Sequence, residues 1–226
     1  MTSHQIPDGL FTMDSAQQLQ QVLDRGLVAI IRAPTGEQLV SVCEALLEGG
    51  IDVIEVTFTV PGILDILKEV RAKLGDRILL GAGTVLDTES ARAALLAGAE
   101  FLVTPTVNLD VIRLCRRYGK LVMAGAFTPT EVLTAWEAGA DVVKVFPAEI
   151  GGPAHLKALK GPLPQVRLLP TGGVTLETLA NFVKAGACAV GLGGALVEQQ
   201  AIAERNVARI RERAAAFVEC MRQARG

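Results

Sequence analysis

A lysine inside a hydrophobic segment is the first candidate for chemistry in this chain. Residues 142–146 read V-V-K-V-F, and Pro147 follows them. Three valines and a phenylalanine predict a buried strand, and Lys144 stands in the middle of it. Burial of an ammonium group is costly and lowers the lysine pKa, and the neutral amine is a nucleophile. Lys144 is therefore a candidate Schiff-base former, and the alternative is a lysine held in a buried ion pair.

A carboxylate is predicted to share the same interior. In the segment I-D-V-I-E-V-T-F, residues 51–58, Glu55 lies on one strand face with Val53 and Thr57, and the more apolar face should pack on helices. On its own strand, Lys144 shares a face with Phe146. An amine and a carboxylate in one enclosed space indicate nucleophilic and acid–base chemistry, and the alternative is a salt bridge that organises the core.

A fourfold repeat supplies the elements that position these residues. Similar segments begin at residues 46, 95, 136 and 183, and each reads as a helix end, a glycine that caps the helix in the left-handed conformation, and a buried strand. Four more strand-like segments occur at residues 27–32, 78–83, 120–125 and 166–173. We take the equivalent glycines of the repeat to be Gly49, Gly98, Gly139 and Gly186.

Eight strands alternating with eight helices predict a closed (β/α)8 TIM barrel, with a doubly wound open sheet as the alternative. We expect one domain over residues 1–226, with a barrel core at 27–197 and a C-terminal helix within 198–226. An N-terminal tail and helix, residues 1–25, should place helix 15–24 under the barrel. The residues expected to dock the C-terminal helix on the core are Val207, Ile210, Ala214, Phe217 and Met221.

Composition narrows the possible functions. The net charge of −2 argues against a general nucleic-acid or anionic-membrane binder. The four cysteines show no C-x-x-C spacing and there are only two histidines, so we expect neither a zinc site nor a disulfide framework. No signal peptide and no membrane-spanning run is evident. The cysteine spacing favours a reducing compartment, and the acidic pI is ordinary for a cytoplasmic enzyme.

In a barrel of this kind, the active site lies at the carboxyl ends of the strands. Arg32 ends the first strand and could bind a carboxylate through two hydrogen bonds, the alternative being a surface ion pair. The turns after the seventh and eighth strands read P-T-G-G at 170–173 and G-L-G-G at 191–194. Glycines there let backbone N–H groups approach an anion, so they favour a phosphorylated or anionic substrate.

Five segments in one order resemble a known family. They are I-E-V-T-F at 54–58, G-A-G-T-V at 81–85, K-V-F-P-A-E at 144–149, K-G-P-L-P-Q-V-R at 160–167 and P-T-G-G-V at 170–174. They resemble 2-keto-3-deoxy-6-phosphogluconate (KDPG) aldolase, whose family includes 4-hydroxy-2-oxoglutarate (KHG) aldolases. The resemblance, over about residues 27–197, implies a homotrimeric class I aldolase of the Entner–Doudoroff route. Such an enzyme cleaves KDPG reversibly to pyruvate and glyceraldehyde 3-phosphate without metal or organic cofactor.

The resemblance also implies roles for individual residues. Lys144 would form the Schiff base, and Glu55 would shuttle protons through a water. Thr84 and Pro105 would seat the pyruvyl part of the substrate, and Thr171 would lie near the new stereocentre. Gly172 and Gly173 would help to hold the phosphate. The reading of the strand ends adds Arg32, Phe146, Gly193 and Gly194 as predicted binding residues.

Two departures from the family pattern keep alternatives open. Thr59 stands where many members have an arginine that contacts the pyruvyl carboxylate, so Arg32 is the replacement candidate. Gly194 stands where a serine often helps to bind phosphate, so an unphosphorylated substrate such as 4-hydroxy-2-oxoglutarate remains possible. A different phosphate-binding barrel enzyme and a non-catalytic barrel scaffold are the remaining alternatives.

Overall fold

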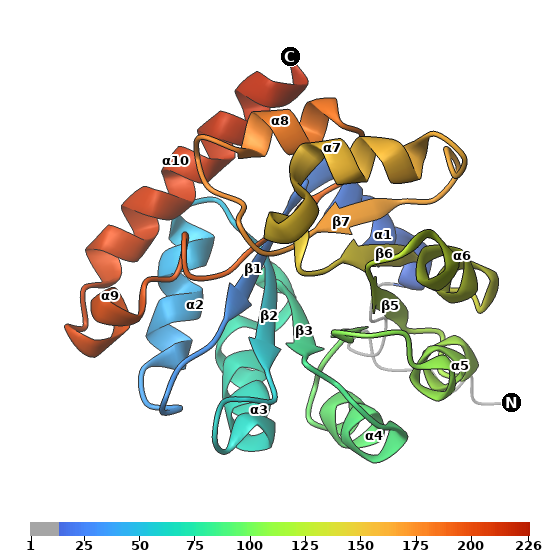
Figure 1. Cartoon of the computed structure of the whole chain (residues 1–226). Coiled ribbons are helices and arrows are strands. Elements are labelled where there is room, and N and C mark those ends of the chain that lie inside the picture. Colours follow the sequence, from blue (N-terminus) through green and yellow to red (C-terminus); the bar gives the residue numbers. More distant parts are fainter. Residues whose placement is uncertain (1–13) are drawn as a thin grey trace, which may run out of the picture.

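The computed structural model describes residues 14–226, and in these residues strands alternate with helices around a barrel (Figure 1). Residues 1–13, part of the expected N-terminal tail, lie outside this range. The strands are β1 (Leu27–Ile31), β2 (Val53–Thr57), β3 (Leu79–Gly83), β4 (Phe101–Val103), β5 (Leu121–Ala126), β6 (Val142–Val145), β7 (Leu168–Pro170) and β8 (Val190–Leu192). The helices are α1 (Ser15–Arg25), α2 (Leu39–Glu48), α3 (Ile63–Leu74), the short 3-10 helix Gly75–Arg77, α4 (Thr88–Leu96), α5 (Leu109–Arg117), α6 (Pro129–Glu137), α7 (Ala148–Lys160), α8 (Leu179–Lys184), α9 (Gln199–Ala203) and α10 (Val207–Arg225).

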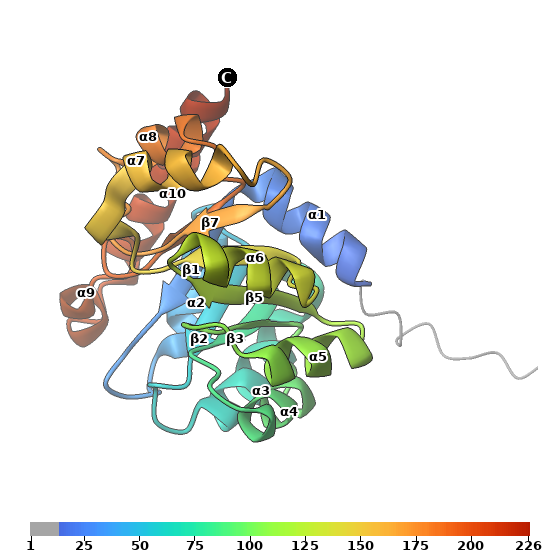
Figure 2. The same cartoon turned by 45° about the vertical axis from the view of Figure 1, so that its right-hand side comes forward.

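The eight strands form one parallel sheet that closes on itself. Each strand from β1 to β6 pairs in parallel with the next along the chain, and β8 pairs with β1. The seam between β7 and β8 holds two parallel bridges, Leu168 with Ala187 and Thr171 with Gly191. The helices α2 to α8 and α10 lie outside the strands (Figures 1 and 2). The predicted (β/α)8 barrel is confirmed, and the open-sheet alternative is wrong.

Strand residues divide between two separate cores because successive side chains point to opposite faces. Val53 and Val142 belong to a small cluster inside the barrel. Their chain neighbours Ile54 and Val143 belong to the larger cluster between the strands and the surrounding helices. Because alternate residues share a face, this division sends Glu55 and Lys144 into the barrel, as the sequence predicts.

Helix α1 closes the end of the barrel where the strands begin. Its residue Val22 is fully buried and packs in the interior cluster with residues near the start of several strands, among them Val28, Val53 and Leu79. The helix begins at a capping box in which Asp14 accepts from the Gln17 amide. The predicted helix under the barrel is confirmed and runs one residue beyond the expected end.

The repeat glycines have the predicted left-handed conformation in three of the four units. The φ angles are 107° at Gly98, 97° at Gly139 and 98° at Gly186, but Gly49 has φ −80° and Gly50 has φ 92°. The assignment of Gly49 was therefore wrong by one residue, because this unit carries two adjacent glycines. Gly49 serves close packing instead: a Cβ atom there would lie 2.5 Å from Ala214 Cβ of α10.

The chain ends in two helices rather than the one expected within 198–226. Arg205 has φ 54° and separates α9 from α10, and the Asn206 side chain then accepts from the Arg209 amide to begin α10. Four of the five residues predicted to dock this helix are buried, but Val207, in its first turn, is 40% exposed. Within residues 14–226 the structure has no helix long and apolar enough to cross a bilayer.

Candidate active site at the carboxyl ends of the strands

Lys144 and Glu55 both lie inside the barrel and are almost completely buried. Their relative exposures are 2% and 1%. Among residues 14–226, neither forms a direct salt bridge, and Glu55 Oε1 has no hydrogen-bond partner. The Lys144 Nζ atom lies 5.3 Å from the centre of the Phe146 ring. The structure therefore shows two buried ionisable groups that interact through space, and it does not show the buried ion pair that was the alternative.

Burial shifts both groups toward their neutral forms. Loss of solvent raises the pKa of the Glu55 carboxyl, and the positive charges of Lys144 and Arg32 only partly oppose this rise. Loss of solvent also lowers the pKa of Lys144, Glu55 opposes this change, and Arg32 adds to it. The result is an amine suited to attack a carbonyl carbon and a carboxyl group suited to hold and return a proton.

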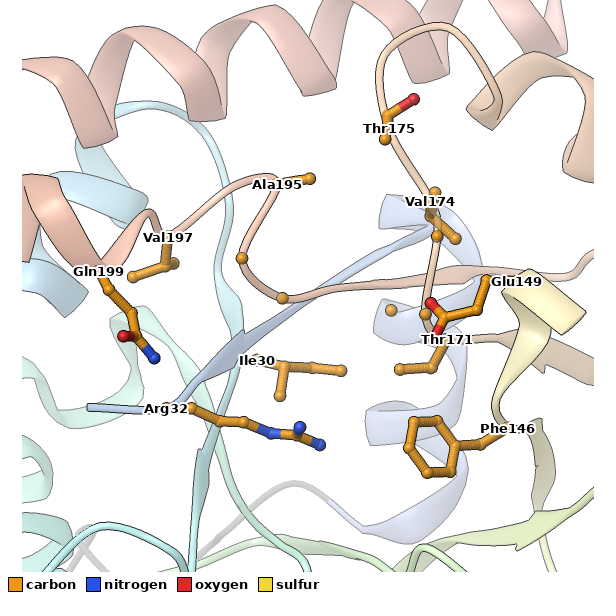
Figure 3. A pocket seen from close by; sticks show the side chains of 15 residues that line it. Ile30, Arg32, Phe146, Glu149, Thr171, Val174, Thr175, Ala195, Val197 and Gln199 are labelled. Atoms are coloured by element: carbon orange, nitrogen blue, oxygen red, sulfur yellow. The ribbon is translucent and has the colours of Figure 1, made fainter. Parts of the chain in front are cut away.

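A cavity of about 530 Å³ opens at the carboxyl ends of β1, β7 and β8. Figure 3 shows Arg32 on one side of it and Phe146 and Thr171 on the other. Lys144 and Glu55 do not line the cavity themselves. Phe146, whose ring lies 5.3 Å from Lys144 Nζ, lines it instead, as does Thr171, which directly follows β7. Seven predicted residues line this cavity: Arg32, Phe146, Thr171, Gly172, Gly173, Gly193 and Gly194.

The glycine turns offer free N–H groups to the cavity. Gly172 and Gly173 have φ angles of 95° and 70°, a conformation that other residues rarely adopt. The amides of Gly172, Gly173 and Gly194 donate to no acceptor within the described part of the chain. Several unpaired backbone donors at one turn cluster form a site that suits an anion.

Arg32 provides the positive charge at this end of the barrel. Within residues 14–226 it forms no ion pair, so the surface ion pair that was its alternative is not seen. Among the described residues that line the cavity it is the only basic one. Thr59, the residue at the expected arginine position, is hydrogen-bonded to Thr57 through hydroxyl groups 2.6 Å apart.

Thr84 and Pro105 lie outside the cavity lining. Thr84 directly follows β3 and has φ 56°, a strained conformation for a β-branched residue. Pro105 packs against Gly125: a Cβ atom at residue 125 would lie 2.2 Å from the Pro105 carbonyl carbon. Gly125 of β5 pairs with Lys144 of β6, so one strand, β5, separates Pro105 after β4 from the lysine.

Sequence reasoning missed several residues that line the cavity. Glu149 lies in the first turn of α7 and Gln199 at the start of α9, whereas the search for site residues considered strand ends. Glu149 belongs to the segment K-V-F-P-A-E, so its spacing from Lys144 was a usable signal. The other residues missed are Ile30, Val174, Thr175, Gly191, Ala195 and Val197.

Residues 14–226 contain no group of three or more histidine, cysteine, aspartate or glutamate side chains arranged to hold a metal ion. The four cysteines are free thiols. The chemistry of the site, as the structure presents it, rests on an amine, a carboxyl group, a guanidinium and backbone donors.

Comparison with known proteins shows the family of this chain. The family model described as KDPG and KHG aldolase matches residues 19–213. The chain is 38% identical to 2-dehydro-3-deoxy-6-phosphogalactonate aldolase of Escherichia coli K12, over 88% of this chain and 95% of that one. It is 40% identical to 2-dehydro-3-deoxy-phosphogluconate aldolase of Treponema pallidum, over 70% of this chain and 75% of that one.

A solved structure adds chemical detail. The KDPG aldolase of Legionella pneumophila, with pyruvate captured as a covalent carbinolamine intermediate, superimposes with a TM-score of 0.80 at 29% identity, over 88% of this chain and 97% of that one. The expected enzyme class, a carbon–carbon lyase of the Schiff-base type, is therefore confirmed. The chain belongs to the KDPG and KHG aldolase family.

Proposed function

We propose that this enzyme cleaves KDPG reversibly to pyruvate and glyceraldehyde 3-phosphate, in the Entner–Doudoroff route of carbohydrate metabolism. One observation carries the proposal: a buried amine lies 5.3 Å from the ring of Phe146, and Phe146 lines a cavity together with glycine turns that have free N–H groups, while a buried carboxyl group lies in the same barrel interior. This arrangement suits a substrate with a keto group at one end and an anionic group at the other. The curated relatives act on phosphorylated 2-keto-3-deoxy sugar acids, as their names state.

The mechanism follows from the states of Lys144 and Glu55. The neutral amine of Lys144 attacks the C2 carbonyl carbon, and protonated Glu55 gives its proton to the departing hydroxyl group, which leaves as water. This step leaves an iminium that withdraws electrons and converts Glu55 to its carboxylate form. Glu55 in its carboxylate form accepts the proton of the C4 hydroxyl, and the C3–C4 bond breaks to release the aldehyde. The enamine on Lys144 takes a proton at C3 from Glu55 through a water, and hydrolysis frees pyruvate.

The surrounding residues would bind the two ends of the substrate. Arg32 would hold the substrate carboxylate, with Thr84 and Pro105 seating the pyruvyl part. Thr171, whose buried Oγ1 has no partner within residues 14–226, would bond a hydroxyl near C4, and Phe146 would pack beside the reacting carbons. The phosphate would be bound by backbone amides of Gly172, Gly173, Gly193 and Gly194.

Several further properties stay predictions. They are a homotrimer, a cytoplasmic location, a single domain over residues 1–226 and the absence of a metal or organic cofactor. The homotrimer rests on the family resemblance. It is checked by light scattering coupled to size-exclusion chromatography.

A second candidate is cleavage of 4-hydroxy-2-oxoglutarate to pyruvate and glyoxylate. Gly194 favours it, because the position where many relatives carry a phosphate-binding serine here offers only a backbone amide. The two substrates share the pyruvyl end, so the same Lys144 and Glu55 would serve both.

Borohydride trapping with pyruvate tests the proposal. We expect a pyruvyl adduct on Lys144 by peptide mass spectrometry, no adduct in Lys144→Met, and the same Lys144 adduct in the matched control Lys157→Met. Lys157 is exposed on α7, and its ammonium group has no partner in the described structure. An enzyme that forms no adduct at any lysine would not use a Schiff base, and the proposed function would be wrong.

A further inference from the structure

A carboxylate stands inside the anion-binding part of the cavity. Glu149 lines the cavity, its side chain is exposed, and its carboxylate has no hydrogen-bond or ion-pair partner within residues 14–226. Among the described lining residues it is the only acidic one. A carboxylate that is unpaired in the native state and faces a ligand cavity is available to interact with the ligand.

The carboxylate lies directly over the glycine turn that follows β7. A Cβ atom at Gly172 would be 2.9 Å from Glu149 Oε2, and a Cβ atom at Gly173 would be 2.6 Å from Glu149 Cβ. Figure 3 shows Glu149 beside Thr171, on the side of the cavity opposite Arg32. The same turn that presents free N–H groups to an anion therefore also presents a negative charge.

These two features have opposite effects on a phosphate. The amides favour it, but a carboxylate a few ångström away repels it, and the one basic lining residue of the described chain lies across the cavity. A hydroxyl-bearing end without phosphate meets no such repulsion. It can donate a hydrogen bond to the carboxylate, and hydrogen bonds to charged acceptors are stronger than those to neutral ones.

We propose that Glu149 is a specificity-determining residue that weakens the preference for a phosphorylated aldehyde fragment and lets the enzyme also accept unphosphorylated, polyhydroxylated 2-keto-3-deoxy acids. This inference rests on the proposed function and names the second substrate class of the same site. The keto end of both substrate classes binds at Lys144. The opposite end of the substrate, which lies near Glu149, sets which class the enzyme prefers.

The test compares two substrates in three proteins. We measure kcat/KM for KDPG and for unphosphorylated 2-keto-3-deoxygluconate in the wild type, in Glu149→Gln and in Glu137→Gln. The Glu149→Gln replacement removes one charge about 5 Å from a dianion in a water-like medium. It should therefore raise the ratio of kcat/KM for KDPG to kcat/KM for 2-keto-3-deoxygluconate about tenfold. Glu137 is exposed in the last turn of α6, at the other end of the barrel. The Glu137→Gln variant loses the same charge far from the cavity, so its ratio of kcat/KM values should match that of the wild type.

A binding measurement keeps this test independent of turnover. Calorimetry with glycerol 3-phosphate, an ester that cannot form a Schiff base, should show about tenfold tighter binding to Glu149→Gln than to the wild type or Glu137→Gln. Equal ratios and equal affinities in all three proteins would overturn the role of Glu149. Loss of the Lys144 adduct with pyruvate in the wild type would instead overturn the proposed function, so the two failures are distinguishable.

Discussion

Gly83 and Glu55 lie so close that residue 83 has no room for a side chain. A Cβ atom at residue 83 would lie 1.5 Å from Glu55 Oε1 and 2.3 Å from its carboxyl carbon. The two residues belong to neighbouring strands, in which Gly83 pairs with Thr57. The glycine of the segment G-A-G-T thus makes space for a buried carboxyl group.

The Gly83→Ala replacement places a methyl group where the Glu55 carboxyl group lies, so it should displace that group. We expect kcat/KM to fall about 100-fold or more, the scale of a lost general acid–base, while borohydride trapping of pyruvate on Lys144 continues. Steady-state kinetics and peptide mass spectrometry check both outcomes. Gly161→Ala is the control, because its Cβ would contact nothing closer than 3.4 Å. Wild-type activity in Gly83→Ala would show that the position of Glu55 does not limit the reaction.

The raised pKa of Glu55 predicts how stability depends on pH. Above the ordinary glutamate value of 4.5, the unfolded chain loses this proton while the folded protein keeps it, so the stability of the folded state falls as pH rises toward the raised pKa. The Glu55→Gln variant has no titratable carboxyl group at this position, so it lacks this pH-dependent loss of stability. The Tm of Glu55→Gln minus that of the wild type should therefore increase as pH rises above 4.5, measured by scanning calorimetry. Two Tm curves that stay parallel over this range would contradict the prediction.

Arg32 should affect both pyruvate binding and the reactivity of Lys144. We expect Arg32→Gln to raise the half-saturating pyruvate concentration for borohydride inactivation about tenfold or more, because a charge-assisted carboxylate contact is lost. Since Arg32 also lowers the pKa of Lys144, its removal should move the pH dependence of inactivation to higher pH. Arg32→Lys should keep the pH dependence but not the full affinity, because lysine retains the charge without the bidentate geometry. An unchanged affinity of Arg32→Gln for pyruvate would show that other groups bind the pyruvate carboxylate.

Gly194 offers a site at which preference for phosphate can be increased. A Cβ atom there meets no heavy atom within 4 Å, so Gly194→Ser should fold normally and place a hydroxyl in the cavity. One added donor to a charged phosphate should raise kcat/KM for KDPG about tenfold, whereas Gly194→Ala, which adds the β-carbon without the hydroxyl, should not. If the serine and alanine variants behave alike, Gly194 does not contact the phosphate.

Local patterns were enough to predict most of the fold. Valine-rich segments, helix-ending glycines and their spacing indicated eight strands and a barrel, because burial on both faces of a parallel strand leaves a continuous apolar run in the sequence. Alternation along the strand also predicted that Lys144 and Glu55 point inward. The errors came where the pattern was ambiguous: two adjacent glycines at Gly49, and the break between α9 and α10.

The sequence by itself determined the chemical groups, the strand faces that carry them and the family. The tertiary structure alone decided which groups share a cavity. Glu149 and Gln199 reach it from helices rather than strand ends, and Thr84 and Pro105 lie outside its lining. The lack of a direct salt bridge between Lys144 and Glu55 is also a tertiary property. The reason is physical: strand periodicity gives the direction of a side chain, but distances across a barrel depend on how eight strands and their connecting loops pack together.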